Sequence, residues 1–216
     1  MDWKSLLSNH SKDINQHNIL NTNAETGEKA SLFLKNKAVC TQESGYILVE
    51  GPDAEVFLQG QVTCDVSNVV QGASVNGAHL NPQGKVIFSF LLSKLKKGLI
   101  ILDVNKPILA TAMSSLEKYA VFSKVTLSLS ENFYSFLISS KASDDLLKLT
   151  GYSSIQKLSK GIIYSIVPKT LFSKWFDLIK DDITLIHNDI SRCIRINAGL
   201  TAVSYTHLTL PTNVAV

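Results

Sequence analysis

The chain has 216 residues, of which 45% are hydrophobic and 18% charged, and its formal net charge is +3. A core can therefore be buried, and no apolar run reaches the roughly 18 residues of a membrane span, so no membrane partner is expected. Only Arg192 and Arg195 among the 21 basic residues are arginine, so direct nucleic-acid binding is weakly supported. The polar start at Met1-Asp2-Trp3-Lys4 lacks the layout of a secretion signal, and we expect a cytoplasmic protein.

The side chains that carry chemistry form no recognisable catalytic or metal-binding pattern. The three cysteines are widely spaced and odd in number, which argues against a disulfide framework and agrees with free thiols in a reducing compartment. The five histidines lack the spacing of metal ligands, and His79 lies in a predicted strand, where a hydrogen-bonded structural role is favoured. No phosphate-binding loop or nucleophile motif occurs. The residues alone predict neither a metal site nor a catalytic residue.

Residues 1–38 are predicted to form an N-terminal helix and a linker. Trp3, Leu6, Leu7 and Ile14 recur at helical spacing, and a polar stretch broken by Gly27 follows them. A first compact region is predicted from residue 39 to residue 130.

That first region alternates between predicted strands and helices. Ala54–Gln59 fits a short helix closed by Gly60, where a positive φ would turn the chain tightly. Asn81-Pro82-Gln83-Gly84 has proline and glycine at the positions that suit a type I turn, which predicts a hairpin. The other predicted elements are strands at Tyr46–Val49, Gly77–Asn81, Lys85–Leu92, Leu99–Val104 and Lys124–Ser128, and a helix over Ile108, Ala112, Leu116 and Tyr119 that Asn105 caps.

A second compact region is predicted over residues 131–199. Its expected strands are Phe133–Ile138, Ile162–Val167 and Ile190–Ile196, and its expected helices are Ala142–Thr150 and, capped by Thr170, Leu171–Lys180. Strands and helices interleave without a strict parallel repeat. The predicted fold class is therefore α+β, with mostly antiparallel sheets and packed helices.

Three strings of residues resemble segments of one protein family, in the same order and with fitting spacing. Residues 57–66, Phe-Leu-Gln-Gly-Gln-Val-Thr-Cys-Asp-Val, resemble the segment F-L-Q-G-Q-V-T-x-D-V. Residues 77–86 resemble the segment A-x-H-x-x-x-x-G-K, and residues 116–125 resemble L-K-K-Y-x-x-x-S-K-V. The family is that of the YgfZ-type folate-binding proteins, relatives of the glycine-cleavage T-protein, an aminomethyltransferase. The resemblance covers roughly residues 39–199.

The resemblance implies an aminomethyltransferase-like folate-binding fold, with a tetrahydrofolate derivative as cofactor. It implies an accessory protein, rather than an enzyme, that supports iron–sulfur cluster assembly or maintenance and thereby tRNA processing and modification. Its partners would be folate and, indirectly, iron–sulfur proteins or their assembly machinery. Two alternatives stay open: a folate-dependent aminomethyl transferase, for which Asp65 is the only candidate acid, and a module that binds tRNA directly.

The folate contacts implied by the resemblance lie mostly on the three strings. A pterin ring needs a flat apolar slot with a few convergent donors and acceptors. Gln61, Thr63 and Asp65 would supply these from one side of an extended segment, unless Thr63 and Asp65 only cap the local backbone. Lys85, Lys118 or Lys124 would hold the glutamate tail. The predicted binding residues are Gln61, Thr63, Asp65, Asn81, Lys85, Tyr119, Lys124, Arg195 and Asn197.

The chain departs from the family pattern at three positions of the implied site. Arg195-Ile196-Asn197-Ala198-Gly199 resembles R-x-E-A-G, but Asn197 replaces the glutamate that holds the pterin in T-protein relatives. An amide offers one acceptor atom where a carboxylate offers two, a loss of roughly 1–3 kcal/mol if the site is buried. Ser44 and Ser191 stand where bacterial relatives tend to carry tryptophan. These departures predict weaker folate binding.

The end of the chain departs further. After Gly199 the family continues to a K-G-C-Y-x-G-Q-E motif and a C-terminal β-barrel, and residues 200–216 resemble neither. We therefore expect a C-terminally truncated chain that lacks the barrel, with a tail that is artefactual or disordered.

Overall fold

The computed structural model describes residues 38–41, 44–139, 154–157, 162–177, 184–186 and 191–197, which form two five-stranded sheets and several helices. The first sheet has the strand order β3-β4-β5-β2-β6 and the second β10-β1-β7-β9-β8. Their strands are β2 (Ser44–Glu50), β3 (Ser74–Leu80), β4 (Val86–Lys96), β5 (Leu99–Asn105) and β6 (Thr126–Ser130) in the first, and β1 (Ala38–Thr41), β7 (Phe133–Ser139), β8 (Ser154–Lys157), β9 (Ile162–Pro168) and β10 (Thr184–Ile186) in the second.

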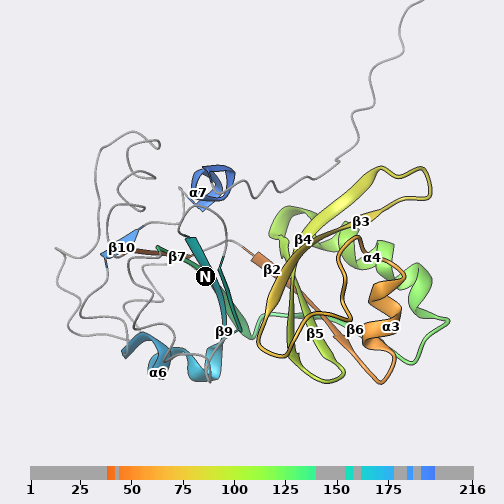
Figure 1. Cartoon of the computed structure of the whole chain (residues 1–216), viewed down its shortest axis with the longest axis horizontal. Coiled ribbons are helices and arrows are strands. Elements are labelled where there is room, and N and C mark those ends of the chain that lie inside the picture. Colours follow the sequence, from red (N-terminus) through yellow and green to blue (C-terminus); the bar gives the residue numbers. More distant parts are fainter. Residues whose placement is uncertain are drawn as a thin grey trace, which may run out of the picture.

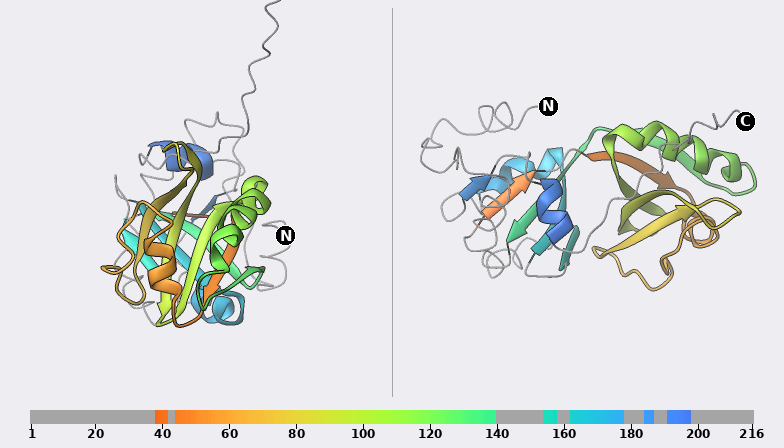
Figure 2. Two further views of the ribbon diagram at one scale, coloured as in Figure 1. Left: turned by 90° about the vertical axis from the view of Figure 1, so that its right-hand side faces the viewer. Right: turned by 90° about the horizontal axis from the view of Figure 1, so that it is seen from above.

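The two sheets lie side by side across the molecule, and helices α3 and α4 lie with the first sheet (Figure 1). Figure 2 shows α4 running along this sheet when the molecule is seen from above. Among the described strand pairs, only β1 and β10 run parallel. The helices are α3 (Ala54–Gln59), α4 (Leu109–Ala120), α6 (Phe172–Asp177) and α7 (Ser191–Asn197).

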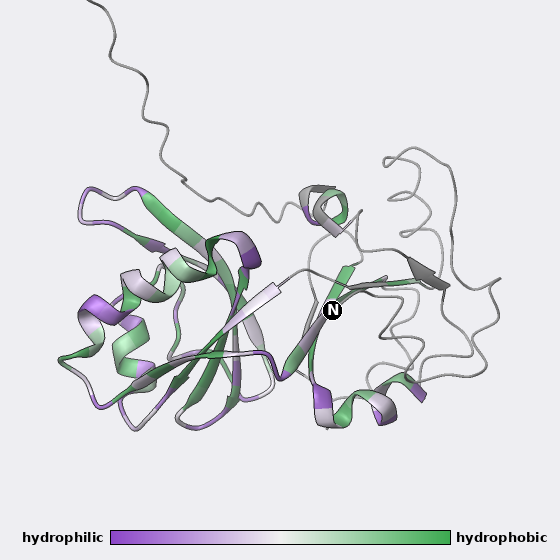
Figure 3. Cartoon of the chain, turned by 180° about the vertical axis from the view of Figure 1, so that it is seen from behind, coloured by the Kyte–Doolittle hydropathy of each residue, from purple (hydrophilic) through white to green (hydrophobic). Residues whose placement is uncertain are grey.

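One face of the first sheet is apolar and packs against α3 and α4. Because neighbouring side chains on a strand point to opposite faces, Ile100, Leu102 and Val104 share this face of β5, and all three are fully buried. Ala112 and Leu116 face them from α4 and are equally buried. In Figure 3, green stretches run along the strands of this sheet and are interrupted by white and purple ones. Further members of the cluster are Ile47, Val49, Ala54, Phe57, Leu58, Cys64, Val66, Val69, Phe88, Phe90, Leu92 and Ile108.

The opposite face of the first sheet packs against the second sheet. Tyr46, Leu91 and Ile101 from the first sheet form one cluster with Ala38, Leu137, Ile162, Tyr164 and Ile166 from the second and with Ile194 of α7. Helix α6 packs on the other face of the second sheet, where the Trp175 ring stacks on Phe136 with centroids 4.4 Å apart. The first sheet is thus enclosed on both faces, by helices on one side and by a sheet on the other.

The fold class predicted from sequence is confirmed, with α+β architecture and mostly antiparallel sheets. The hairpin around residues 81–84 is present, and the helix at Ala54–Gln59 has the predicted bounds. The last strand of the first sheet begins at Thr126 rather than at Lys124. Strand β1 precedes β2 directly in sequence but pairs with β7 and β10, so it belongs to the second sheet. None of the helices in the described ranges has the length and hydropathy to cross a membrane.

Two predicted helix caps, and the backbone conformation expected at Gly60, are wrong. Gly60 closes α3 with φ −81°, an ordinary helical value, so its freedom for positive φ is not used. Asn105 makes no capping hydrogen bond with its side chain, because a 3₁₀ turn at Lys106–Ile108 precedes α4. Thr170 lies inside a second 3₁₀ turn, Lys169–Leu171, and α6 begins only at Phe172.

The predicted strand at Ile190–Ile196 is wrong, because this segment forms helix α7. Its isoleucines favour a strand by propensity. However, the neighbouring residues Cys193 and Ile194 both pack against the cluster between the sheets. Two adjacent residues can face one core from a helix but not from an alternating strand, so tertiary packing decides the conformation. The N-terminal helix and linker, the helix predicted at Ala142–Thr150 and the tail 200–216 lie outside the described residues.

Candidate functional site

The first two family-like strings are joined by hydrogen bonds at the end of β3. The Thr63 amide donates to the Ala78 carbonyl oxygen at 3.0 Å, and the Ala78 amide donates to Thr63 Oγ1 at 3.0 Å. A single bridge between Val62 and His79 lies beside these bonds. Residues 61–68 form turns rather than the extended segment predicted from sequence, so Gln61, Thr63 and Asp65 do not share one strand face.

His79 connects all three strings. Its side chain is only 2% exposed, and Nδ1 lies 2.7 Å from the Gln61 carbonyl oxygen. A carbonyl oxygen only accepts, so Nδ1 carries a proton, and in the neutral ring Nε2 presents a lone pair. Nε2 is buried and has no hydrogen-bond partner among the described residues. The ring meets Tyr119 of the third string edge to face, with centroids 6.2 Å apart.

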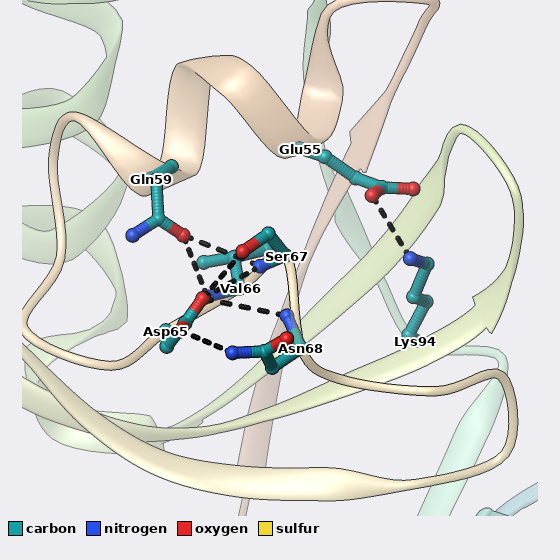
Figure 4. A network of polar contacts seen from close by, with 7 residues as sticks. All are labelled: Glu55, Gln59, Asp65, Val66, Ser67, Asn68 and Lys94. Carbon is teal, nitrogen blue, oxygen red and sulfur yellow. Dashed lines mark hydrogen bonds and ion pairs between the residues drawn. The ribbon is translucent and has the colours of Figure 1, made fainter.

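The Asp65 carboxylate serves the turn in which it lies (Figure 4). Asp65 Oδ1 accepts from the hydroxyl of Ser67 at 2.6 Å and from its amide at 3.1 Å, and Oδ2 accepts from Asn68 Nδ2 at 2.6 Å. These bonds, the Ser67 hydroxyl first, hold the pKa of the exposed Asp65 carboxyl below its ordinary value. Gln59 Oε1 accepts from the Val66 amide at 2.7 Å and so ties the same turn to α3. These contacts favour the alternative that Thr63 and Asp65 cap nearby backbone amides.

Asn81 has a comparable local role in the β3–β4 turn. Its Oδ1 accepts from the Gln83 amide at 3.0 Å and from the Lys85 amide at 2.8 Å. The Gly84 amide closes the turn on the Asn81 carbonyl at 2.9 Å, and Gly84 has φ 77°, which favours glycine. The Lys85 side chain is exposed at this tip.

The third string ends α4 and leads into an exposed turn. Tyr119 is 38% exposed, and both Lys118 and Lys124 are exposed. The Lys124 amide donates to Asp53 Oδ2 at 2.8 Å, which ties the turn to the start of α3. The hydrogen bond fixes the backbone of this turn, and the exposed lysine side chains can contact an anionic group.

Arg195 and Asn197, the remaining predicted binding residues, lie on α7 beside the junction of the two sheets. Arg195 is half-buried. Burial raises the pKa of the Asp103 carboxyl on β5, and the positive charge of Arg195 offsets part of that rise. Asp103 is only 3% exposed and accepts a hydrogen bond from the Tyr164 hydroxyl at 2.6 Å through Oδ2. Burial also raises the pKa of Tyr164.

More polar groups surround this buried carboxyl. Tyr46 pairs with Asp103 in the β2–β5 register, and its hydroxyl lies 2.8 Å from Ser135 Oγ on β7. Ser135 Oγ donates in turn to Ser44 Oγ at 2.9 Å. Ser44 thus belongs to a polar chain that crosses from one sheet to the other.

Sequence reasoning missed Asp103 as a functional candidate. It had taken Asp65 for the only acid available to a transferase, although Asp65 is exposed and committed to its turn. The signal for Asp103 was present, since it is the lone charge in the apolar run Leu99–Val104. A charged residue inside such a run is rarely buried without a partner. Finding that partner required the fold, because Tyr164 lies 61 residues away in sequence.

The described residues do not assemble a metal site, since no three His, Cys, Asp or Glu side chains gather within them. Cys64 is buried in the apolar cluster beside Gly77, and burial raises the pKa of its thiol. Cys64 therefore acts as a small apolar side chain, as predicted, and Cys193 is a free thiol of intermediate exposure.

The chain is similar in sequence to curated proteins over part of its length. The chain is 39% identical over 88 residues to the tRNA-modifying protein YgfZ of Hamiltonella defensa, covering 41% of this chain and 26% of that protein. It is 30% identical over 136 residues to the tRNA-modifying protein YgfZ of Aliivibrio fischeri strain MJ11, covering 63% of this chain and 42% of that protein. The chain thus spans less than half the length of these curated relatives. No protein-family model matches it.

The fold has a solved counterpart. The glycine cleavage system aminomethyltransferase T from Bartonella henselae superposes with a TM-score of 0.64 at 15% identity, over 82% of this chain and 55% of that one. The chain is therefore similar over part of its length to tRNA-modifying proteins YgfZ, and its fold is aminomethyltransferase-like.

Proposed function

We propose that this chain is a folate-binding accessory protein that supports tRNA modification, acting through the maintenance of iron–sulfur clusters. The tRNA part is supported by the YgfZ relatives, which are tRNA-modifying proteins by name. The folate part is supported by the T-protein-like fold and by the meeting of the three family-like strings at His79.

The observation that carries the folate proposal is the unpartnered acceptor of His79. A buried polar atom without a partner costs free energy, so its persistence favours a role in binding. Nε2 accepts a hydrogen bond from a donor such as a pterin N–H, and Tyr119 next to it offers an aromatic edge and a hydroxyl. A reduced folate supplies such a planar donor ring together with an anionic tail.

Other side chains would complete the site. Gln61 lies beside His79, and the exposed ammonium groups of Lys85 and Lys124 suit the carboxylates of the tail. Arg195 and Asn197 on α7 occupy the segment that resembles the family's pterin-holding segment. Thr63, Asp65 and Asn81 would act indirectly, because their side chains shape the turns that present these groups.

Binding is tested by titrating the folded chain with 5-formyltetrahydrofolate, a stable reduced folate, in a calorimeter. We expect saturation at one site per chain. The Asn197→Glu variant restores a carboxylate and should tighten binding by roughly tenfold, whereas Asn76→Glu on the exposed edge of β3 adds the same charge elsewhere and should not. A folded chain that shows no saturation, with Asn197→Glu equally inert, would refute the folate part.

The tRNA part needs a cellular test. In a bacterium whose own YgfZ-type gene is deleted, the chain is expressed and the modified nucleosides of total tRNA are measured by mass spectrometry. We expect partial recovery of nucleosides made by iron–sulfur enzymes. If the chain binds folate in vitro but does not change the tRNA nucleosides, the folate part of the proposal stands and the tRNA part is rejected.

A further inference from the structure

Most of the exposed large apolar side chains in the described part of the chain lie on one short stretch, made of the end of α4, the turn that follows it and strand β6. Val121 and Phe122 in the turn are 76% and 87% exposed, and Leu129 on β6 is 55% exposed. Away from this stretch, Val56 and Val70 are the other exposed large apolar residues among those described. Single apolar residues are common on protein surfaces, but a group of them at one edge indicates an interaction site.

Strand β6 is an edge of the first sheet, because it pairs with β2 and, among the described strands, with no other. Its register with β2 is regular over five residues, from Thr126 opposite Glu50 to Ser130 opposite Tyr46. The outward backbone groups of an edge strand are ready to pair with another strand. Proteins usually protect such an edge with a charged side chain, a proline or a bulge. The sequence Thr-Leu-Ser-Leu-Ser of β6 contains neither a charge nor a proline, and its pairing contains no bulge.

The other edge of the first sheet, β3, is protected in two ways. The segment after α3 covers its end, through the bridge between Val62 and His79 and the hydrogen bonds between Thr63 and Ala78. The pairing of β3 with β4 also shifts register between His79 and Leu80. A sheet that covers one edge and leaves the other open points to β6 as the edge that accepts a further strand.

The sequence of β6 is complementary to a second copy of itself in the antiparallel direction. Ser128 is the central residue of the strand. A two-fold axis at Ser128 places Leu127 of one copy opposite Leu129 of the other, and Thr126 opposite Ser130. Opposite residues of an antiparallel pair have their side chains on the same face. The exposed Leu129 therefore gains an apolar neighbour, and the hydroxyl side chains lie beside one another on the other face.

The charges at the two ends of β6 favour the same arrangement. Lys124 precedes the strand, Glu131 follows it, and both are exposed. Antiparallel pairing brings the lysine end of each copy to the glutamate end of the other. Parallel pairing would bring like charges together, which costs free energy. Charge and side-chain complementarity thus both point to a second copy of the chain as the occupant of this edge.

We propose that two copies of this chain associate through antiparallel pairing of their β6 strands around Ser128, so that the two first sheets become one continuous sheet. The paired edge spans five residues, so the association is weak, with a dissociation constant of roughly 10–100 µM. The inference goes beyond the proposed function and does not depend on it, because the association requires no folate.

Sedimentation velocity of the full chain measures this association, over concentrations from about one tenth to about ten times the expected dissociation constant. Leu129→Lys places a charge on the edge and should raise the dissociation constant at least about tenfold. Thr126→Lys, at the other end of the strand and also exposed, should do the same. The matched control Val70→Lys puts the same charge at an exposed apolar position away from β6 and should leave the dimer intact.

Each of two results in this assay would overturn the proposal. One is a chain that sediments as a monomer at every concentration. The other is a dimer that tolerates lysine at both Thr126 and Leu129. Both positions are exposed, so the variants should keep the thermal midpoint of the unmodified chain, and a change in association is then a change at the edge.

The register is tested by a cross-link between the two copies. Residues directly opposite in an antiparallel pair have Cβ atoms about 4.5–5.5 Å apart, close to the separation that a disulfide spans. Ser128→Cys should therefore form a covalent dimer with oxidised glutathione, whereas Val70→Cys should not. The unmodified chain gives the background from the native thiols. If the chain dimerises but Ser128→Cys forms no more covalent dimer than Val70→Cys, the copies do not meet at β6.

The direction of pairing is tested by reversing charges. Glu131→Lys brings lysines together at both ends of an antiparallel pair and should weaken dimerisation several-fold, more at low salt than at high salt. The double variant Lys124→Glu/Glu131→Lys restores opposite signs and should recover the affinity. If the double variant stays as weak as Glu131→Lys, the antiparallel arrangement is wrong. All these measurements are made without folate, so a failure of the proposed function does not affect their outcome.

Discussion

The two faces of the first sheet bury different kinds of side chain, and β5 displays the contrast within two consecutive residues. Leu102 points into the apolar cluster under α3 and α4, whereas Asp103 points toward the second sheet and bonds to Tyr164. Both are almost completely buried. On the helix-covered face, every apolar side chain removed from water stabilises the fold. On the face between the sheets, burial of the polar groups costs free energy unless they find partners.

This contrast separates two tasks. The apolar face holds the first sheet and its helices together without regard to pH or charge. The junction with the second sheet contains groups whose energy depends on their protonation and on the position of α7. The residues proposed to bind folate are distributed over the first sheet, its connecting turns and α7.

The largest expected effect is on the apolar face. Leu102→Ala removes a fully buried side chain from the cluster and leaves a cavity, which should lower the free energy of unfolding by about 2–5 kcal/mol. Urea unfolding monitored by tryptophan fluorescence measures this loss. A change below about 1 kcal/mol would mean that the face is not close-packed and would weaken the comparison.

A second variant tests the same cluster by adding volume. A Cβ atom at Gly77 would lie 2.7 Å from the Phe90 ring and 2.8 Å from Cys64 Sγ. Gly77→Ala should therefore cost about 1–3 kcal/mol through overpacking. The double variant Cys64→Ala/Gly77→Ala makes room on one side and should recover part of that loss in the same urea assay. If no stability is recovered, the added methyl group clashes with Phe90 alone.

The third prediction concerns the other face and depends on pH. Burial raises the pKa of Asp103 above the value it has in the unfolded chain. A raised pKa means that this group favours folding most below its unfolded pKa of roughly 3.9 and loses that contribution as the pH rises through its folded pKa. Urea midpoints of the unmodified chain should accordingly fall, relative to those of Asp103→Asn, as the pH rises from about 4 through the raised pKa of Asp103 in the folded chain.

Leu102→Ala serves as the control for this pH series, because it should shift every midpoint by a similar amount. Parallel curves for the unmodified chain and Asp103→Asn would show that the carboxyl does not titrate in this range. They would remove the difference in pH response between the two faces.

The smallest effect is expected on the surface. Asp65 accepts hydrogen bonds from Ser67 and Asn68, and its pKa is lowered, so its contribution to folding is present at neutral pH and is lost as the pH falls below its unfolded pKa. Asp65→Asn should lower the thermal midpoint slightly at pH 7 and not at all in strong acid. If Asp65→Asn instead abolished one-carbon transfer by an otherwise stable chain, Asp65 would be a catalytic acid and the aminomethyl transferase alternative would gain support.

Elements with a strong local signal were predictable from sequence. The hairpin at residues 81–84 follows from proline and glycine in turn positions. The helix at Ala54–Gln59 follows from the helix-breaking residues Gly51, Pro52 and Gly60 on either side of it. Helix α7 was not predictable, since its isoleucines favour a strand and only packing against the cluster between the sheets makes it helical. Sequence also does not reveal that β1 leaves its neighbour β2 to join the second sheet.

The candidate site was predictable only as a set of segments. Resemblance brought residues 57–66, 77–86 and 116–125 to attention, but the side chains expected to face a ligand, Thr63, Asp65 and Asn81, bond to nearby backbone. The contacts that join the segments run through His79, which sequence favoured as a structural histidine. Asp103 was not predicted because its hydrogen-bond partner Tyr164 lies on another strand, 61 residues away in the chain.

The most direct test of the account is a hydrogen-exchange footprint of 5-formyltetrahydrofolate on the folded chain. The account predicts slower exchange in the peptides that contain Gln61, His79 and Tyr119 and in the peptide of α7, with the apolar strands β4 and β5 unaffected. Saturable binding that protects none of these peptides, or that protects only the outer face of the second sheet around α6, would contradict it.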